Sequence, residues 1–192
     1  MRIAVIFAGG RSSRMQRDKA LLPFAGYSTL SEYQYRRLSK IFDHVYISSK
    51  SNKFDFDIEV IKDKYKESSP LVALVSIFEH LEVKEVFVLS VDSPFVDLST
   101  IDNLYANALE GEDIVVARSP HGVEPLCAIY RRTILPIAKE FLESNNHRLK
   151  SLLSNAKTQY IEFDSSDIFL NLNYPEDYKR AIFSHPPTSE PS

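Results

Sequence analysis

Short apolar runs alternate with helix-type patterns along most of the chain, and this alternation constrains the fold more than any other feature. The first apolar run covers residues 2–6, and the clearest one covers 85–91. Between such runs, apolar residues recur at helical spacing. This order predicts an α/β fold with a doubly wound, mostly parallel sheet. Strands are expected at 2–6, 44–49, 58–61, 85–91, 113–117, 126–130 and 159–163.

Capping residues predict where several helices begin. Thr29 and Glu32 have the spacing of a capping box. Ser69 before Pro70 is typical of an N-cap followed by a proline in the first turn. Asn173 stands in the same way before Pro175. Helices are therefore expected from about 30, over 70–81, 99–110, 133–144 and 147–154, and from 175, while 118–125 has turn chemistry and is expected to be a loop.

Length and composition favour one ordinary globular domain. The 192 residues are enough for a large core, which we expect within 1–183, and the polar, proline-rich tail 184–192 is expected to be disordered. A net charge of −3 argues against non-specific binding of nucleic acid or membranes. No apolar run approaches the roughly 18 residues of a membrane-spanning helix. The single Cys127 excludes an internal disulfide framework and favours a cytoplasmic location.

The segment 7–19 has the parts of a polyphosphate site. It reads Phe-Ala-Gly-Gly-Arg-Ser-Ser-Arg-Met-Gln-Arg-Asp-Lys and directly follows the first expected strand. Gly9 and Gly10 allow backbone N–H groups to approach an anion. Arg14 and Lys19 can neutralise phosphate charge. The spacing fits neither the P-loop nor the dinucleotide fingerprint. A nucleotide site is nevertheless favoured over a plain strand–turn–helix connection.

Two aspartates follow expected strands. Asp92 ends the most apolar one, at the edge of the sheet where open α/β proteins bind ligands. Magnesium takes one or two protein carboxylates together with phosphate oxygens, so Asp92 is expected to anchor a metal–nucleotide complex. The alternative is a turn residue before Pro94. For Asp63, a solvated turn aspartate is as good an interpretation as a ligand.

These motifs resemble the molybdenum cofactor guanylyltransferases, the family of molybdopterin-guanine dinucleotide biosynthesis protein A within the nucleotidyltransferase superfamily. The family signature is Leu-Ala-Gly-Gly-x-Ser-x-Arg-Met-Gly-x-Asp-Lys, from which Phe7 and Gln16 depart. Residues 90–95 resemble its Cys-x-Asp-x-Pro motif and 171–177 its Asn-x-Asn-Thr-Pro-Glu motif. The resemblance covers about residues 1–180 and implies a Rossmann-like fold of the nucleotide-diphospho-sugar transferase type.

The resemblance also implies a reaction and its partners. GMP would pass from GTP to the terminal phosphate of molybdopterin or Mo-molybdopterin, with Mg²⁺ as cofactor and release of pyrophosphate. Further partners would be molybdenum cofactor biosynthesis proteins and molybdoenzyme chaperones. The catalytic residues would be Arg14, Lys19 and Asp92, with Asp92 also the metal ligand. The GTP site would comprise Phe7, Ala8, Gly9, Gly10, Ser12, Lys19, Ser48, Asp63, Pro70, Leu71 and Asp92.

The acceptor site is expected in the C-terminal half of the chain. The resemblance assigns it Arg148, Lys150, Asn171 and Asn173. Helix capping is a sufficient explanation of Asn173, so Asn171 is the better ligand candidate of the two. For Arg148 and Lys150, a solvated basic surface is slightly favoured over a ligand contact.

Two other functions fit the same motifs. One is a nucleotidyltransferase with another base or acceptor, for example in cytidylyl transfer. The other is a nucleotide-binding module without turnover, which would explain why Gln16, Ala73 and Ser48 stand where the family has Gly, Gly and Asn. Magnesium-dependent release of pyrophosphate distinguishes the module from both enzymes.

Overall fold

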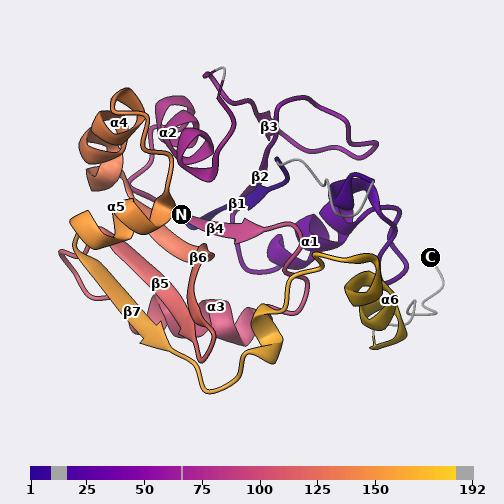
Figure 1. The fold of residues 1–192 in the computed structure, drawn as a ribbon. Coiled ribbons are helices and arrows are strands. Elements are labelled where there is room, and N and C mark those ends of the chain that lie inside the picture. The colour runs from indigo at the N-terminus through magenta and orange to yellow at the C-terminus, as the bar shows by residue number, and fades with distance from the viewer. Residues whose placement is uncertain (10–16, 66, 185–192) are drawn as a thin grey trace.

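A computed structural model describes residues 1–9, 17–65 and 67–184. In these ranges seven strands form one open sheet, in the order β3-β2-β1-β4-β6-β5-β7 (Figure 1). Only β6 runs antiparallel to its neighbours, β4 and β5, and the remaining pairs are parallel. The prediction of a doubly wound, mostly parallel sheet is therefore confirmed. The strands are β1 (Ile3–Phe7), β2 (His44–Ser48), β3 (Val60–Ile61), β4 (Glu85–Ser90), β5 (Ile114–Ser119), β6 (Gly122–Arg131) and β7 (Thr158–Glu162).

Helices cover both faces of the sheet. One face carries α1 (Leu30–Leu38), α3 (Leu98–Ala106) and α6 (Pro175–Ser184). The other carries α2 (Pro70–His80), α4 (Leu135–Glu143) and α5 (Leu149–Asn155), with α2 and α4 side by side (Figure 1). None of the helices in the described ranges is long and apolar enough to cross a membrane. Three 3₁₀ turns complete the fold: η1 (Lys19–Leu21), η2 (Arg132–Ile134) and η3 (Asp167–Phe169).

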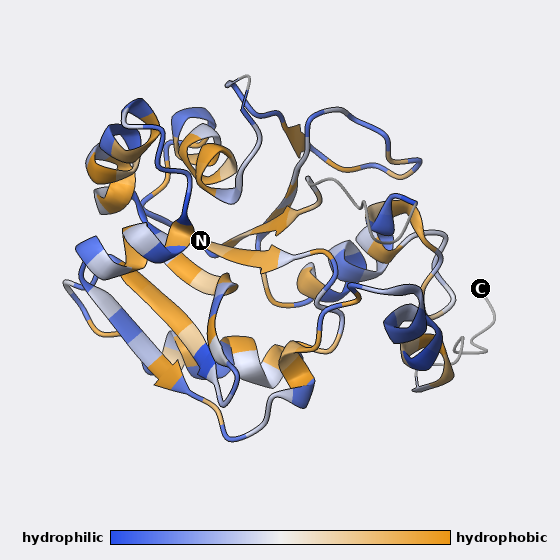
Figure 2. Cartoon of the chain, in the orientation of Figure 1, coloured by the Kyte–Doolittle hydropathy of each residue, from blue (hydrophilic) through white to orange (hydrophobic). Residues whose placement is uncertain are grey.

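The central strand β1 is buried on both sides. Ala4 and Ile6 pack into the cluster formed with α1 and α3, whereas Ile3, Val5 and Phe7 pack into the cluster formed with α2. Successive side chains of a strand point to opposite faces, so a doubly covered strand must be apolar at every position. Figure 2 shows this arrangement, with hydrophobic strands at the centre and a strongly hydrophilic α6 outside. The burial of β1 on both faces could therefore be predicted from the apolar run at the start of the chain.

The expected caps of α1 and α2 are present. The Thr29 side chain accepts a hydrogen bond from the backbone N–H of Glu32, and the Ser69 side chain accepts one from Val72. Helix α3 was expected to reach residue 110 but ends at Ala106. Tertiary hydrogen bonds end it early, because the Gln159 side chain bonds the backbone of residues 107 and 109. Helix α6 includes Ser184, which the sequence assigned to the tail, and the remaining tail 185–192 lies outside the described residues.

The prediction of a loop at 118–125 is wrong, because most of these residues belong to strands. β5 continues to Ser119 and β6 begins at Gly122, so the turn is confined to residues 120–121. The ladder is irregular beyond this hairpin: Ala117 pairs with Glu124, while Val116 pairs with Ala128. Residues 125–127 thus have no partner on β5, although Cys127 still pairs with Leu89 of β4. Proline in a strand is found at such irregularities, because it has no N–H to donate.

Candidate active site

Three sequence motifs meet at the carboxyl edge of the parallel strands. The register places Phe7, at the end of β1, opposite both Ser48 of β2 and Ser90 of β4. The segment that begins at Gly9 therefore starts between the ends of its two neighbours, and Asp92 follows Ser90 directly. Ligands of open α/β sheets bind at this edge, where the strand order reverses.

A first pocket, of about 150 Å³, opens at this edge. It lies between the ends of the strands and the beginning of α2. A Cβ atom added to Gly9 would meet only the Ser48 carbonyl oxygen, at 4.0 Å, so the fold itself does not require glycine there. The absence of a side chain instead leaves the backbone of Gly9 accessible from the pocket. The lining residues are Phe7, Gly9, Ser48, Asp63, Ser68, Ser69, Pro70, Ala73, Ser90 and Leu126.

Asp63 lines the first pocket and has one carboxylate oxygen without a hydrogen bond in the described part of the chain. Its Oδ1 atom is buried and has no hydrogen-bond partner within the described part of the chain. Burial raises the pKa of Asp63, an effect that Lys50 partly offsets. A buried, unpaired acceptor destabilises the folded state. This observation does not fit a solvated turn aspartate, and it favours a ligand that donates a hydrogen bond.

Beside the first pocket, a lysine joins segments that are distant in the sequence. Lys19 Nζ donates to Asp92 Oδ2 at 2.8 Å and to Asn173 Oδ1 at 2.9 Å. Ser90 Oγ donates to the other Asp92 oxygen at 2.6 Å. The Lys19 and Asp92 side chains are only 13% and 18% exposed, so this ion pair is partly shielded from water. The carboxylate of Asp92 is thereby held in one orientation.

Asn173 has a different role from the predicted helix cap. Its side-chain oxygen accepts from Lys19, and the Asp177 carboxylate instead accepts from the backbone N–H groups of Asn173 and Tyr174. Asn171, the residue that capping did not explain, accepts from Ser93 Oγ at 2.5 Å. Both asparagines therefore lie at the site, and the one assigned a capping role contacts the predicted catalytic lysine.

A second pocket, of about 240 Å³, adjoins the first and shares Ser90 and Leu126 with it. Sequence reasoning did not assign Leu126 to the site, because the irregular stretch of β6 that presents it was read as the end of a loop and the start of a strand. The only available signal was Pro125 within a strand-like run. The lining residues are Ser90, Asp92, Ser93, Val96, Glu124, Pro125, Leu126, Cys127, Phe169 and Asn171.

The remaining predicted site residues fall into three groups. Leu71 is fully buried in α2, and Ala8 is buried with its N–H bonded to the Ser48 carbonyl, so neither lines the two pockets. Arg148 and Lys150 are exposed at the beginning of α5, and within the described part of the chain they form no hydrogen bond or ion pair with Asn171 or Asn173. Predictions for Gly10, Ser12, Arg14 and Gln16 lie outside the described residues.

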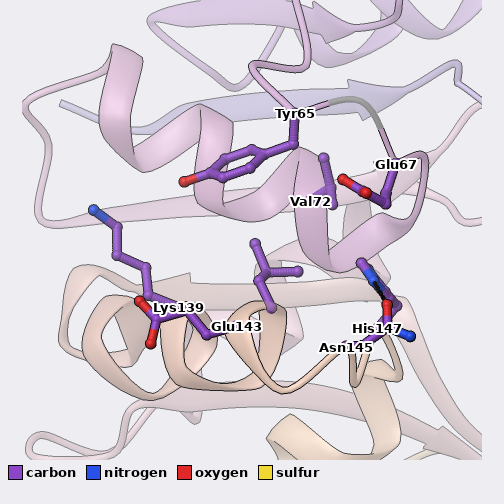
Figure 3. A pocket seen from close by; sticks show the side chains of 8 residues that line it. Tyr65, Glu67, Val72, Lys139, Glu143, Asn145 and His147 are labelled. Carbon is purple, nitrogen blue, oxygen red and sulfur yellow. Dashed lines mark hydrogen bonds between the residues drawn. The ribbon is translucent and has the colours of Figure 1, made fainter.

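A third and larger pocket, of about 370 Å³, lies between α2 and α4 (Figure 3). Tyr65 and Glu67 face Lys139 and Glu143 across it. It holds none of the glycine-segment or strand-end residues, and its Lys139 is paired with Glu79 at 2.6 Å. We therefore do not place the reaction there. It touches the first pocket through His147, whose Nδ1 lies 3.2 Å from Ser69 Oγ.

The fold and the site together define a class of protein. The chain has an open α/β sheet with two adjoining pockets at its carboxyl edge, and the Lys19–Asp92 pair lies at the same edge. This combination, with a glycine-containing segment after the first strand, is typical of enzymes that bind nucleotides. Comparison with known proteins identifies the class as nucleotidyltransferase. The family model described as the MobA-like NTP transferase domain matches residues 4–160, and the chain therefore belongs to this family.

Similar proteins agree with this assignment. A molybdenum cofactor guanylyltransferase of Campylobacter jejuni subsp. doylei is 38% identical over 178 residues, which are 92% of this chain and 93% of the relative. One of Helicobacter pylori is 34% identical over 184 residues, 93% of this chain and 90% of the relative. The crystal structure of molybdopterin-guanine dinucleotide biosynthesis protein A from Archaeoglobus fulgidus has a TM-score of 0.80 at 22% identity, covering 94% and 96% of the two chains. At that identity, the crystal structure supports the fold alone.

Proposed function

We propose that this protein transfers GMP from GTP to the terminal phosphate of molybdopterin and releases pyrophosphate. Membership of the family and the names of its relatives support the class of reaction. The observation that carries the choice of base is Asp63, which lines the first pocket and whose buried Oδ1 has no hydrogen-bond partner among the described residues. Guanine has a ring N–H and a neighbouring amino group on one edge, and a carboxylate accepts hydrogen bonds from both. Adenine and cytosine lack that pair of donors.

The arrangement of the two pockets supports a separate binding place for each substrate. In this proposal the base lies in the first pocket, and the triphosphate extends along the segment that begins at Gly9 toward Lys19. Arg14 and the backbone of Gly10 remain part of the proposed phosphate site by their place in the motif. The second pocket holds the acceptor. Its terminal phosphate would then reach the α-phosphate near Asp92.

The donors around Asp92 fit Mg²⁺, which prefers oxygen ligands. The carboxylate of Asp92 is close to the amide oxygen of Asn173, because Lys19 bonds both. Within residues 1–9, 17–65 and 67–184 no group of three His, Cys, Asp or Glu side chains could hold a metal alone. Phosphate oxygens and water would therefore complete the ligand set, as is usual for this ion. The bound ion would supply charge neutralisation at the α-phosphate.

The residues of the chain would act by position and charge. The acceptor phosphate is already an anion, so no general base is needed. One of its oxygens bonds to the α-phosphorus of GTP while the bond to the bridging oxygen breaks, and pyrophosphate leaves with that electron pair. Two anions must be held in line for this exchange. Lys19 supplies positive charge beside Asp92, which lines the second pocket, and Ser90 keeps Asp92 oriented.

Calorimetric titration of the four nucleoside triphosphates tests the base site. In the presence of Mg²⁺ we expect GTP to bind at least on the order of 10²-fold more tightly than ATP, CTP or UTP, because the other bases leave buried polar groups unpaired. The Asp63→Ala variant should lose most of this preference. Equal affinity of the unmodified protein for GTP and ATP, or a preference for CTP, would contradict the guanine assignment.

A further inference from the structure

Glu124 is a half-buried carboxylate in the second pocket, and the reaction proposed above makes no use of it. It lies on β6 where the ladder becomes irregular, so that Ala117 pairs with Glu124 and Val116 with Ala128. Irregularities of this kind redirect side chains beside active sites. Here Glu124 contributes to the wall of the same pocket as Asp92.

One side of the Glu124 carboxylate is fixed by the protein. Ser119 is buried, and its Oγ donates to Glu124 Oε1 at 3.0 Å. The same Oγ accepts from the backbone N–H of His121 at 3.2 Å, which orients the hydroxyl. Across the described ranges, Oε2 has no hydrogen-bond partner and Glu124 forms no ion pair. One oxygen is thus held by the chain while the other has no protein partner.

The surroundings of Glu124 differ from those of the other carboxylate in the pocket. Asp92 has the ammonium group of Lys19 as its counter-charge, whereas Glu124 forms no ion pair with any of the described residues. Burial raises the pKa of Glu124, against weaker opposite effects of Ser119 and His121. A carboxylate in this position is stabilised by a ligand that donates hydrogen bonds. The pocket also offers apolar surface for a flat ring, from Val96, Pro125, Leu126, Cys127 and Phe169.

We propose that Glu124 selects the acceptor by accepting hydrogen bonds from the amino-substituted pyrimidine edge of its pterin ring. This inference rests on the proposed function, which makes molybdopterin the acceptor. That edge carries a ring N–H beside an exocyclic amino group. Oε2 would accept from one donor, and the remaining lone pair of Oε1 would accept from the other. Because Asp92 and Glu124 line one pocket, a single acceptor can contact both.

A pair of simple heterocycles tests this recognition without turnover. Pterin has the 2-amino group, whereas lumazine has a carbonyl oxygen in its place. We expect the unmodified protein to bind pterin on the order of tenfold or more tightly than lumazine, as measured by their fluorescence. Glu124→Gln has the same shape but one acceptor fewer, and should bring the ratio close to one. Glu162→Gln removes an exposed carboxylate on β7 and should leave the ratio unchanged.

Steady-state kinetics separates this inference from the reaction itself. In the Glu124→Gln variant we expect the KM for molybdopterin to rise on the order of tenfold while the KM for GTP stays within about twofold. Transfer with unchanged KM values would overturn the role of Glu124 and leave the reaction standing. If the unmodified protein transfers no GMP to molybdopterin, the proposed function fails, and the pterin–lumazine ratio then decides the role of Glu124. A ratio near one, or no binding of pterin, overturns it.

Discussion

At the scale of single residues, Lys19 has the most connections in the site. One ammonium group contacts a carboxylate that ends β4 and an amide just before α6, at 2.8 and 2.9 Å. The pair with Asp92 is partly buried, so removing either partner leaves a charge in a poorly solvated place. Lys19 therefore has a structural role in orienting Asp92 as well as its proposed contact with phosphate.

Replacement of Lys19 by alanine tests this double role. We expect Lys19→Ala to lower kcat/KM for GMP transfer on the order of 10²-fold, because positive charge is lost where two phosphates meet. The matched control is Lys139→Ala, which breaks the ion pair with Glu79 at the third pocket and should leave transfer nearly unchanged. Steady-state rates with GTP and molybdopterin give kcat/KM for both variants and for the unmodified protein. An unaltered kcat/KM in Lys19→Ala would assign this residue a structural role only.

Asp63 carries a measurable cost to stability. Burial raises its pKa, so the folded state holds the proton more firmly than the unfolded state does. The stabilisation from this proton is complete at acid pH and is lost as the pH rises through the raised pKa. Near neutral pH we therefore expect Asp63→Asn to raise Tm by a few degrees, an advantage that should disappear as the pH falls through the ordinary aspartate range.

Thermal melts of Asp63→Asn over a series of pH values provide this measurement. The exposed Asp55→Asn serves as the control and should show little change in Tm at any pH. The same Asp63 variant should bind GTP more weakly, so stability and binding change in opposite directions. A Tm gain that persists undiminished at acid pH would show that ionisation of Asp63 is not its cause.

At the scale of elements, the first turn of α2 couples helix capping to the site. Ser69 caps this helix through the N–H of Val72, and it also lines the first pocket and lies beside His147. Thr29 makes the equivalent cap on α1, through the N–H of Glu32, but lines neither pocket of the site. A comparison of variants at the two caps can therefore distinguish the effect of a lost cap on stability from its effect on ligand affinity.

The variants Ser69→Ala and Thr29→Ala should be similar in stability and different in binding. Loss of either N-cap costs about 0.5–2 kcal/mol, so we expect both to lower Tm by several degrees. Only Ser69→Ala should also weaken GTP binding, by several-fold, because its helix forms a wall of the first pocket, where we propose that the base binds. Melting curves and GTP titrations of both proteins test this. Equal GTP affinity in the two variants would mean that the start of α2 does not shape the pocket.

Element by element, the sequence predicts structure where the cause is local. The caps of α1 and α2 and the doubly buried β1 follow from neighbouring residues, and all three are confirmed. The end of α3 was wrong because it depends on Gln159, which no local pattern relates to that helix. The hairpin of β5 and β6 was taken for a loop because Pro125 and its neighbours have turn composition, although proline is compatible with an irregular strand.

At the scale of the whole molecule, the strand order brings the motifs together. Placing β1 between β2 and β4 puts Phe7 opposite both Ser48 and Ser90, so that Gly9 and Asp92 follow neighbouring strand ends, a juxtaposition that the doubly wound fold predicts. The contact between Lys19 and Asn173 was not predictable, because no local pattern relates the start of η1 to the residues just before α6. Capping offered a sufficient local explanation of Asn173 and concealed its place in the site.

Guanylyl transfer can be followed through both of its products in one assay. Purified protein is incubated with molybdopterin, Mg²⁺ and each of the four nucleoside triphosphates in turn, and pyrophosphate and the pterin dinucleotide are quantified together. We expect both products in equal amounts with GTP, little of either with ATP, CTP or UTP, and none when the metal is chelated. Comparable dinucleotide formation with CTP or ATP, or GTP binding without release of pyrophosphate, would show that the protein is not a guanylyltransferase.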